Sequence, residues 1–80
     1  MSKRKKQQPD AKVFGATVRR LREKRGWTQE ELAERAEMNA SYLGFVERGD
    51  NVPTLTIILQ IARAFEIDPG DLLREVADQF

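Results

Sequence analysis

Apolar residues recur three and four positions apart along most of this chain, which is the spacing of helices that bury one face. No segment shows the strict alternation of apolar and polar residues that a half-buried strand needs. The helical pattern falls into five segments, 12–25, 29–36, 40–48, 55–65 and a last one that opens at Pro69. The sequence therefore predicts an all-α fold of five short helices.

Residues that start and end helices stand between these segments. Thr28 and Glu31 have the spacing of a capping box, in which each side chain accepts a hydrogen bond from the other residue's backbone N–H. Further start signals and glycine stop signals mark the other boundaries: Asn39, Thr54, Asp68 before Pro69, Gly26 and Gly49. These local signals support the same five helices independently of the apolar spacing.

The net charge of +1 hides an uneven distribution of charge. Residues 1–27 hold ten lysines and arginines against two acids, whereas residues 28–80 hold four arginines against eleven acids. A polyanion would be attracted to the first part and repelled by the second. The polar stretch 1–11, with cations at 3–6, is interpreted as a flexible basic arm ahead of a domain at 12–80.

Composition argues against several classes of function. The 80 residues include no cysteine and no histidine, which removes thiolate ligands and the commonest general base at neutral pH. Adjacent acids such as Glu30 and Glu31 point to different sides of a helix, and so small a domain has no room for a closed cleft. We expect no enzyme, metal, cofactor or small-molecule ligand. Without a secretory signal or an apolar run near the ~20 residues of a membrane span, a soluble, cytoplasmic protein is expected.

The segment 28–49, TQEELAERAEMNASYLGFVERG, predicts two short helices joined by a tight connection. This is the arrangement of a helix-turn-helix unit. In such a unit the second helix can lie in the major groove of DNA while the first crosses the phosphate backbone.

Linked motifs across this region resemble those of a known family. WTQEELAERA, then MNASYLGFVERG and then the pattern P-T-L-x-x-I-L-x-I-A strongly resemble the Cro/repressor (Xre-like) helix-turn-helix family. The resemblance covers about residues 12–77 and implies a lambda-repressor-like fold that binds double-stranded DNA. Within that family the chain is also similar to the small controller proteins of restriction–modification systems.

The resemblance implies roles for individual residues. Gln29 would contact a phosphate, while Ala40, Ser41 and Phe45 would reach base edges. The complete set of candidate DNA-binding residues is Gln29, Asn39, Ala40, Ser41, Tyr42, Phe45, Arg48 and Asn51, the last two for backbone contacts. The resemblance further implies a structural, partly buried ion pair that links the first and third helices and is formed by Arg22 and Glu47.

The chemistry of these side chains leaves alternatives open. Gln29 has an amide donor at a helix start, which suits a phosphate oxygen, but it could also be a solvated surface residue. Arg48 suits a phosphate, yet an arginine near a helix C-terminus is favourable by itself. Ala40 and Phe45 offer a base only apolar contact, for example to a thymine methyl, so specificity could come from DNA shape or from the basic arm. Phe45 could equally mark a surface for another protein.

A homodimer through the last two helices is expected, because one recognition helix reads few base pairs and symmetric pairing doubles the site. In 55–65 the helical spacing links Leu55, Ile58, Leu59, Ala62 and Phe65. The core candidates are Trp27, Leu32, Leu43, Val46, Ile58, Leu59, Phe65, Leu72 and Val76, and the candidate interface residues are Ile57, Ile61, Ile67, Leu73 and Phe80. Some of the interface candidates could instead complete the core.

The sequence therefore predicts a homodimeric, sequence-preferring regulator of transcription that acts by occupying a promoter, with residues 40–48 as the recognition helix. The alternative is a protein-interaction module of the same fold, such as an antitoxin or a coactivator-like adaptor.

Overall fold

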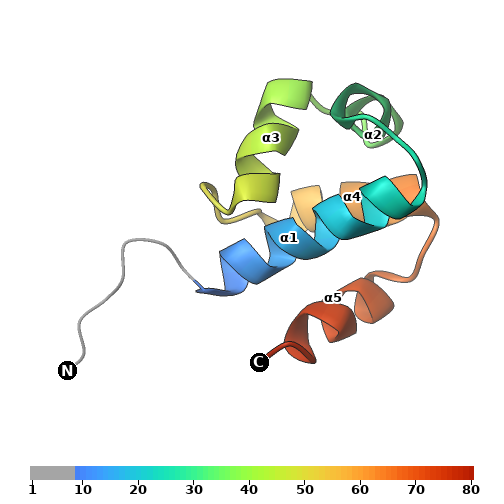
Figure 1. Ribbon diagram of the computed structural model, residues 1–80. Helices are drawn as coiled ribbons and strands as arrows, with labels where there is room; N and C mark the ends of the chain where they lie inside the picture. Colours follow the sequence, from blue (N-terminus) through green and yellow to red (C-terminus); the bar gives the residue numbers. More distant parts are fainter. Residues whose placement is uncertain (1–8) are drawn as a thin grey trace.

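Five helices make up the part of the chain that the structure describes, residues 9–80, and no strand occurs there (Figure 1). In this computed structural model they are α1 (Pro9–Lys24), α2 (Gln29–Arg35), α3 (Ala40–Arg48), α4 (Leu55–Phe65) and α5 (Pro69–Ala77). The predicted all-α class is confirmed, and the predicted bounds of α2, α3 and α4 are correct to within a single residue.

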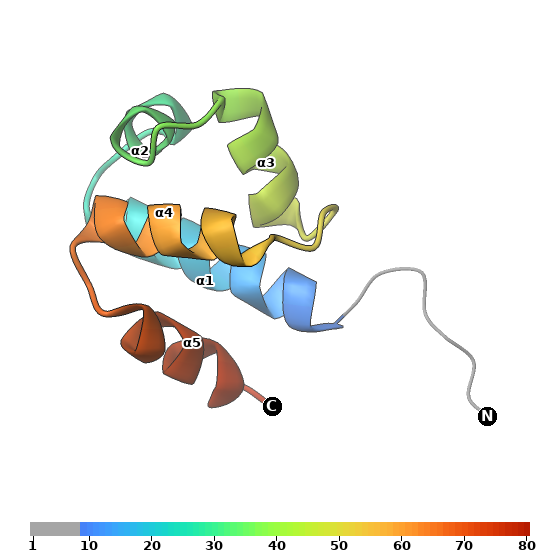
Figure 2. The ribbon, with the colours of Figure 1, turned by 180° about the vertical axis from the view of Figure 1, so that it is seen from behind.

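The helices are arranged in three levels (Figure 1). α1 and α4 occupy the middle, α2 and α3 lie on one side of them, and α5 lies on the opposite side, as the reverse view also shows (Figure 2). α3 packs against α1 and α2, whereas α5 packs against α1 and α4. The helix-turn-helix unit and the last helix are therefore on opposite sides of the molecule.

The predicted caps are present. Thr28 Oγ1 accepts from the backbone N–H of Glu31 at 3.1 Å, and Glu31 Oε1 accepts from the N–H of Thr28 at 2.8 Å, which completes the capping box. Asn39, Thr54 and Asp68 cap α3, α4 and α5 by accepting hydrogen bonds from backbone N–H groups of the first turn, without the reciprocal bond of a capping box. These interactions are local in sequence, and for that reason their positions could be predicted.

α1 begins at Pro9, three residues before its predicted start. Proline at the first helical position has the φ that a helix requires, and Asp10 in the first turn accepts from the backbone N–H of Ala11 at 3.0 Å. Ala11 is buried, so this turn is tied to the core. Residues 9–11 thus belong to the helix rather than to the predicted arm, and the rest of that arm, residues 1–8, lies outside the described residues.

Most of the predicted core residues are buried, but for two residues of α4 the burial is the opposite of what was predicted. Ile61, predicted to lie at a subunit interface, is fully buried, whereas Leu55, linked by spacing to the buried face, is 67% exposed. α4 carries apolar side chains around most of its circumference, so the spacing could not tell which of them its neighbours cover. Trp27 and Ile58 are half-buried at the edge of the core rather than inside it, and Leu59, also predicted to be in the core, is only half-buried.

At Gly15, α1 lies too close to α3 for any side chain, a feature that the sequence reasoning missed. A Cβ atom at this position would press against the carbonyl oxygen of Val46 and lie 2.6 Å from that of Glu47. Only glycine allows the two backbones to come so near. Gly15 therefore sets how close to α1 the third helix can sit.

Candidate nucleic-acid interface

A buried ion pair joins α1 to α3. Arg22 Nε donates to Glu47 Oε2 at 2.7 Å, and its Nη2 donates to Oε1 at 3.0 Å. The two side chains are only 10% and 3% exposed. A third donor of Arg22, Nη1, is bonded to the carbonyl oxygen of Trp27 at 2.8 Å, so the guanidinium also holds the turn that leads into α2. This two-pronged geometry satisfies both charges despite their burial.

The ion pair holds Arg22 in its charged form. The hydrogen bonds to Glu47 raise the pKa of Arg22 above its ordinary value, against the opposing effect of burial. The stability that this shift contributes is present below the ordinary pKa of arginine and is lost only as the pH rises through the raised value. The positive member of the pair therefore keeps its charge throughout the physiological range.

Gln29 extends this network to α2. Its Nε2 donates to Glu47 Oε1 at 2.9 Å, so a single carboxylate ties together all three helices. The residue is half-buried, and its amide lies over Gly44, where a Cβ atom would be 3.7 Å from Oε1 of Gln29. Gln29 is thus fixed in place and is not a freely solvated surface residue. Sequence reasoning missed the bond because it depends on how α2 and α3 cross.

A side chain of α4, Gln60, supports the turn between α2 and α3. Gln60 of α4 donates from Nε2 to the carbonyl oxygens of Ala36 at 2.9 Å and Glu37 at 3.3 Å. Glu37 has a φ of 58°, in the left-handed region that favours glycine, so this turn needs such external support. The angle between the two helices is therefore fixed at two points, by Glu47 within the unit and by Gln60 outside it.

The outer face of α3 is formed by Ser41, Phe45 and Arg48, which lie on one side of the helix at successive turns. Ser41 is exposed, Phe45 is 44% exposed and the Arg48 side chain is 57% exposed. No part of residues 9–80 covers this face. The structure therefore presents α3 to solvent as a helix that a groove could accept.

The remaining candidate residues do not all share this face. Ala40 and Tyr42 are half-buried against the core, and Asn51 is half-buried in the loop that follows α3. Asn39 is exposed, but its Oδ1 accepts from the backbone N–H groups of Ser41 and Tyr42 at 2.7 and 3.3 Å. Its side-chain oxygen is thus already committed to capping α3.

Arg48 has partners within the protein. Its Nε donates to Asp50 Oδ2 at 3.1 Å, and its guanidinium carbon lies 5.1 Å from the centre of the Phe45 ring. These contacts orient Arg48 along the outer face, and Asp50 neutralises part of its charge. The structure places Arg48 beside Phe45 and the loop after α3, where a phosphate contact would be at the edge of the interface.

The described residues show no metal-binding group of histidines, cysteines and acids. No helix within 9–80 has the length and apolar character required to cross a membrane.

Comparison with known proteins identifies the class to which this arrangement belongs. The helix-turn-helix domain family matches residues 13–76, and the chain belongs to that family. It is therefore a DNA-binding regulator of transcription, from a family that is not enzymatic.

Particular relatives share most of their length with this chain. It is 33% identical over 63 residues to the HTH-type transcriptional regulator YazB of Bacillus subtilis, which covers 79% of this chain and 91% of YazB. It is 36% identical over 62 residues to the control protein C.BamHI of Bacillus amyloliquefaciens, which covers 76% of each chain. The crystal structure of the restriction-modification controller protein C.AhdI from Aeromonas hydrophila superposes with a TM-score of 0.78 at 40% identity, over 81% of this chain and 98% of that one. The resemblance to helix-turn-helix regulators, with controller proteins among them, is confirmed.

Proposed function

We propose that this chain is a cytoplasmic, homodimeric regulator of transcription that binds a preferred double-stranded sequence with α3 in the major groove. The observation that carries the proposal is the outer face of α3, which is exposed along its length and held rigidly by the Arg22–Glu47–Gln29 network. A rigid, exposed helix can enter the groove without the loss of conformational entropy that ordering a flexible segment would cost. Bound at a promoter, such a protein acts by occupying it.

The second part of the proposal is the position of α2. The N-terminus of α2 is held against α3, because the amide of Gln29 lies over Gly44 and bonds to Glu47. Backbone N–H groups at a helix start suit a phosphate oxygen, so α2 would contact the backbone while α3 reads bases. The second hydrogen of the Gln29 amide would serve the same phosphate.

The proposal is tested by selecting bound duplexes from a random DNA pool and then measuring the salt dependence of binding to an enriched duplex. A DNA-binding regulator should enrich a two-fold symmetric sequence, and the logarithm of its affinity should fall linearly with the logarithm of salt concentration. Half-sites should be about one helical turn, ~34 Å, apart. If no duplex is enriched at any salt concentration, the proposal is wrong.

The exposed ring of Phe45 supports one competing function, that of a protein-interaction module such as an antitoxin or a coactivator-like adaptor. Such a module would bind a protein through α3 and would ignore duplex DNA. The same selection separates the two candidates, since only the regulator enriches a DNA sequence.

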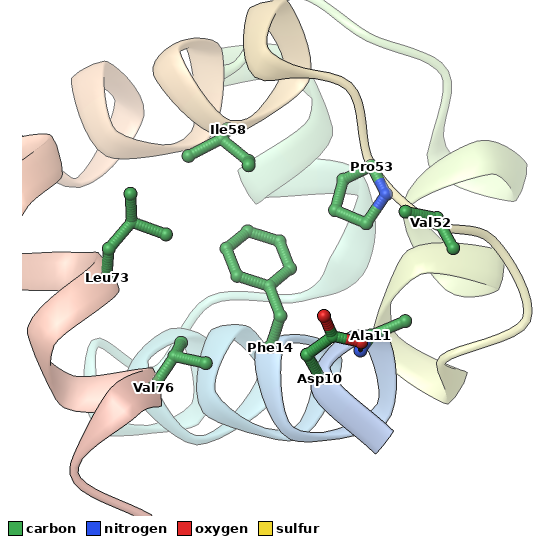
Figure 3. Close-up of a pocket in the computed structure, with 8 residues that line it drawn as sticks. All are labelled: Asp10, Ala11, Phe14, Val52, Pro53, Ile58, Leu73 and Val76. Atoms are coloured by element: carbon green, nitrogen blue, oxygen red, sulfur yellow. Dashed lines mark hydrogen bonds between the residues drawn. The ribbon is translucent and has the colours of Figure 1, made fainter. Parts of the chain in front are cut away.

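Dimerisation is proposed through an apolar surface on α4 and α5. A hollow of about 190 Å³ opens between these helices, α1 and the loop before α4, and Figure 3 shows the side chains of Ile58, Leu73 and Pro53 arranged around the ring of Phe14. Its complete lining is Asp10, Ala11, Phe14, Val52, Pro53, Ile58, Leu73 and Val76. Of the interface residues predicted from sequence, Leu73 and Phe80 are exposed, whereas Ile57 and Ile67 are half-buried against the core and Ile61 lies inside it.

Within residues 9–80, the large exposed apolar side chains are Val52, Leu55, Leu73, Phe80 and, on α3, Phe45. Except for Phe45, they belong to α4, α5, the loop before α4 and the end of the chain. A second copy related by two-fold symmetry would cover this surface with the same surface of its own. We therefore revise the proposed interface to the hollow and the exposed residues Val52, Leu55, Leu73 and Phe80.

Replacing Leu73 with aspartate should convert the dimer to a monomer. The side chain is 42% exposed on the proposed interface, so a carboxylate there would be buried twice, once in each copy. We expect the dissociation constant of the dimer to rise at least about a hundredfold, which corresponds to ~3 kcal/mol. Sedimentation equilibrium at tens of micromolar measures it.

The matched control is Ala16→Asp, which adds the same charge to the exposed outer face of α1. This variant should sediment as the native dimer does. A native chain that is strictly monomeric at tens of micromolar would contradict the dimer itself.

The basic residues at 3–6 are proposed to contact the phosphate backbone. Deletion of residues 2–8 should then weaken DNA binding and reduce the slope of log affinity against log salt by about 0.9 for each phosphate contact that is lost. If the salt slope of the deletion variant equals that of the native chain, these residues make no such contact and serve only solubility.

A further inference from the structure

The outer face of α3 carries few groups that can read a base by paired hydrogen bonds. Side chains that distinguish bases in this way are arginine, lysine, asparagine and glutamine. Of these, α3 presents only Arg48, whose Nε is bonded to Asp50 and whose guanidinium lies over Phe45. The other exposed groups on the face are the hydroxyl of Ser41 and the ring of Phe45.

Phe45 has a neighbour on the outer face, the side chain of Arg48. Arg48 covers one side of the ring at 5.1 Å, and the bond from Arg48 to Asp50 fixes the arginine in turn. The residue before Phe45 is Gly44, which is buried, and a Cβ atom there would lie 3.3 Å from Nη1 of Arg48. An aromatic ring thus stands out from the middle of α3 and is still 44% exposed with Arg48 beside it.

The only apolar group that a standard base pair displays in the major groove is the C5-methyl group of thymine. On the basis of the proposed function, we propose that Phe45 reads a pyrimidine C5-methyl group, so that each half-site carries a thymine opposite the middle of α3. Arg48 keeps the ring in place and reaches the neighbouring phosphate. Specificity then depends on apolar contact rather than on paired hydrogen bonds.

The first test replaces thymine with uracil, one position at a time, in a duplex that the native chain has enriched from a random pool. The two bases differ only by the methyl group, and removal of one buried methyl corresponds to about a fourfold loss of affinity. Fluorescence anisotropy at fixed salt should show that loss at one position in each half-site, and about fifteenfold when both half-sites are changed. Indifference to uracil at every position would overturn the inference.

Three variants assign the effect to Phe45. Phe45→Ala should bind thymine and uracil duplexes with equal affinity, whereas Phe45→Leu, which keeps an apolar contact, should retain part of the preference. Ala16→Ser, on the exposed face of α1, should retain all of it. Because Phe45 is exposed, its variants should melt near the native temperature, and a thymine preference that survives in Phe45→Ala would overturn the inference.

A final experiment distinguishes recognition of the methyl group from recognition of the other groups of thymine. Changing the sensitive T·A pair to C·G should weaken binding, and 5-methylcytosine in the same place should restore about fourfold if the methyl group is what is read. No restoration would mean that another group of thymine is read. Failure to enrich any duplex overturns the proposed function together with this inference, whereas an enriched duplex that does not respond to uracil overturns this inference alone.

Discussion

Replacing Ser41 with glutamate is expected to weaken binding to an enriched duplex by at least about thirtyfold. Ser41 is exposed near the start of α3, on the face proposed to enter the groove, where a carboxylate would approach the phosphates and base acceptors. A lost or repulsive contact costs ~1–3 kcal/mol in each half-site, and a dimer meets it twice. Fluorescence anisotropy at several salt concentrations measures the loss.

The loss should not come from unfolding. Glutamate in the first turn of a helix interacts favourably with the helix dipole, and α3 has no other acid there. The melting temperature of Ser41→Glu should therefore stay near the native value. Ala16→Glu places the same charge on the exposed outer face of α1 and should bind within a fewfold of the native chain. Equal losses in the two variants would show that net charge, rather than the face of α3, determines binding.

Replacing Glu47 with alanine is expected to be the most damaging single change to stability. It would leave the guanidinium of Arg22 buried without its partner and free the amide of Gln29. Removal of one member of a buried ion pair costs ~3–5 kcal/mol, which for a domain of this size lowers the melting temperature by about 15 °C or more. Thermal unfolding followed by circular dichroism measures the change.

Glu34→Ala is the matched control, because Glu34 is an exposed acid on α2. Its effect should remain within ~0.5 kcal/mol. The double variant Arg22→Met/Glu47→Leu, which removes both charges together, should lose less stability than Glu47→Ala alone. If Glu47→Ala and Glu34→Ala melt at the same temperature, the pair contributes nothing to the fold.

Local features of the fold could be predicted from sequence. Each cap depends on residues two or three positions apart, as at Thr28 and Asn39, so the sequence already contains both partners. The start of α1 was missed because Pro9 and Asp10 lie in a polar stretch where apolar spacing gives no signal. Which side of α4 is buried depends on its neighbours. The burial of Ile61 and the exposure of Leu55 were therefore predicted the wrong way round.

In the candidate site too, some features could be predicted from sequence and others could not. The resemblance placed Ser41, Phe45 and Arg48 together, and they share one face of α3. The bond from Gln29 to Glu47 and the support of the turn by Gln60 connect different helices, so they follow from how the helices cross. Contacts of this kind have no periodic signal in a single sequence, and only the structure reveals them.

The most direct test of the account is to map where α3 lies on DNA. The chain has no cysteine, so Ser41→Cys gives one attachment point for an iron chelate that cleaves nearby DNA, and Ala16→Cys gives a matched probe on α1. We predict that the probe at position 41 cuts both strands within each half-site, with the strand offset of major-groove cleavage, while the probe at position 16 cuts weakly or not at all. Cleavage from position 16 but not from position 41, or a minor-groove offset from position 41, would contradict the claim that α3 reads the major groove.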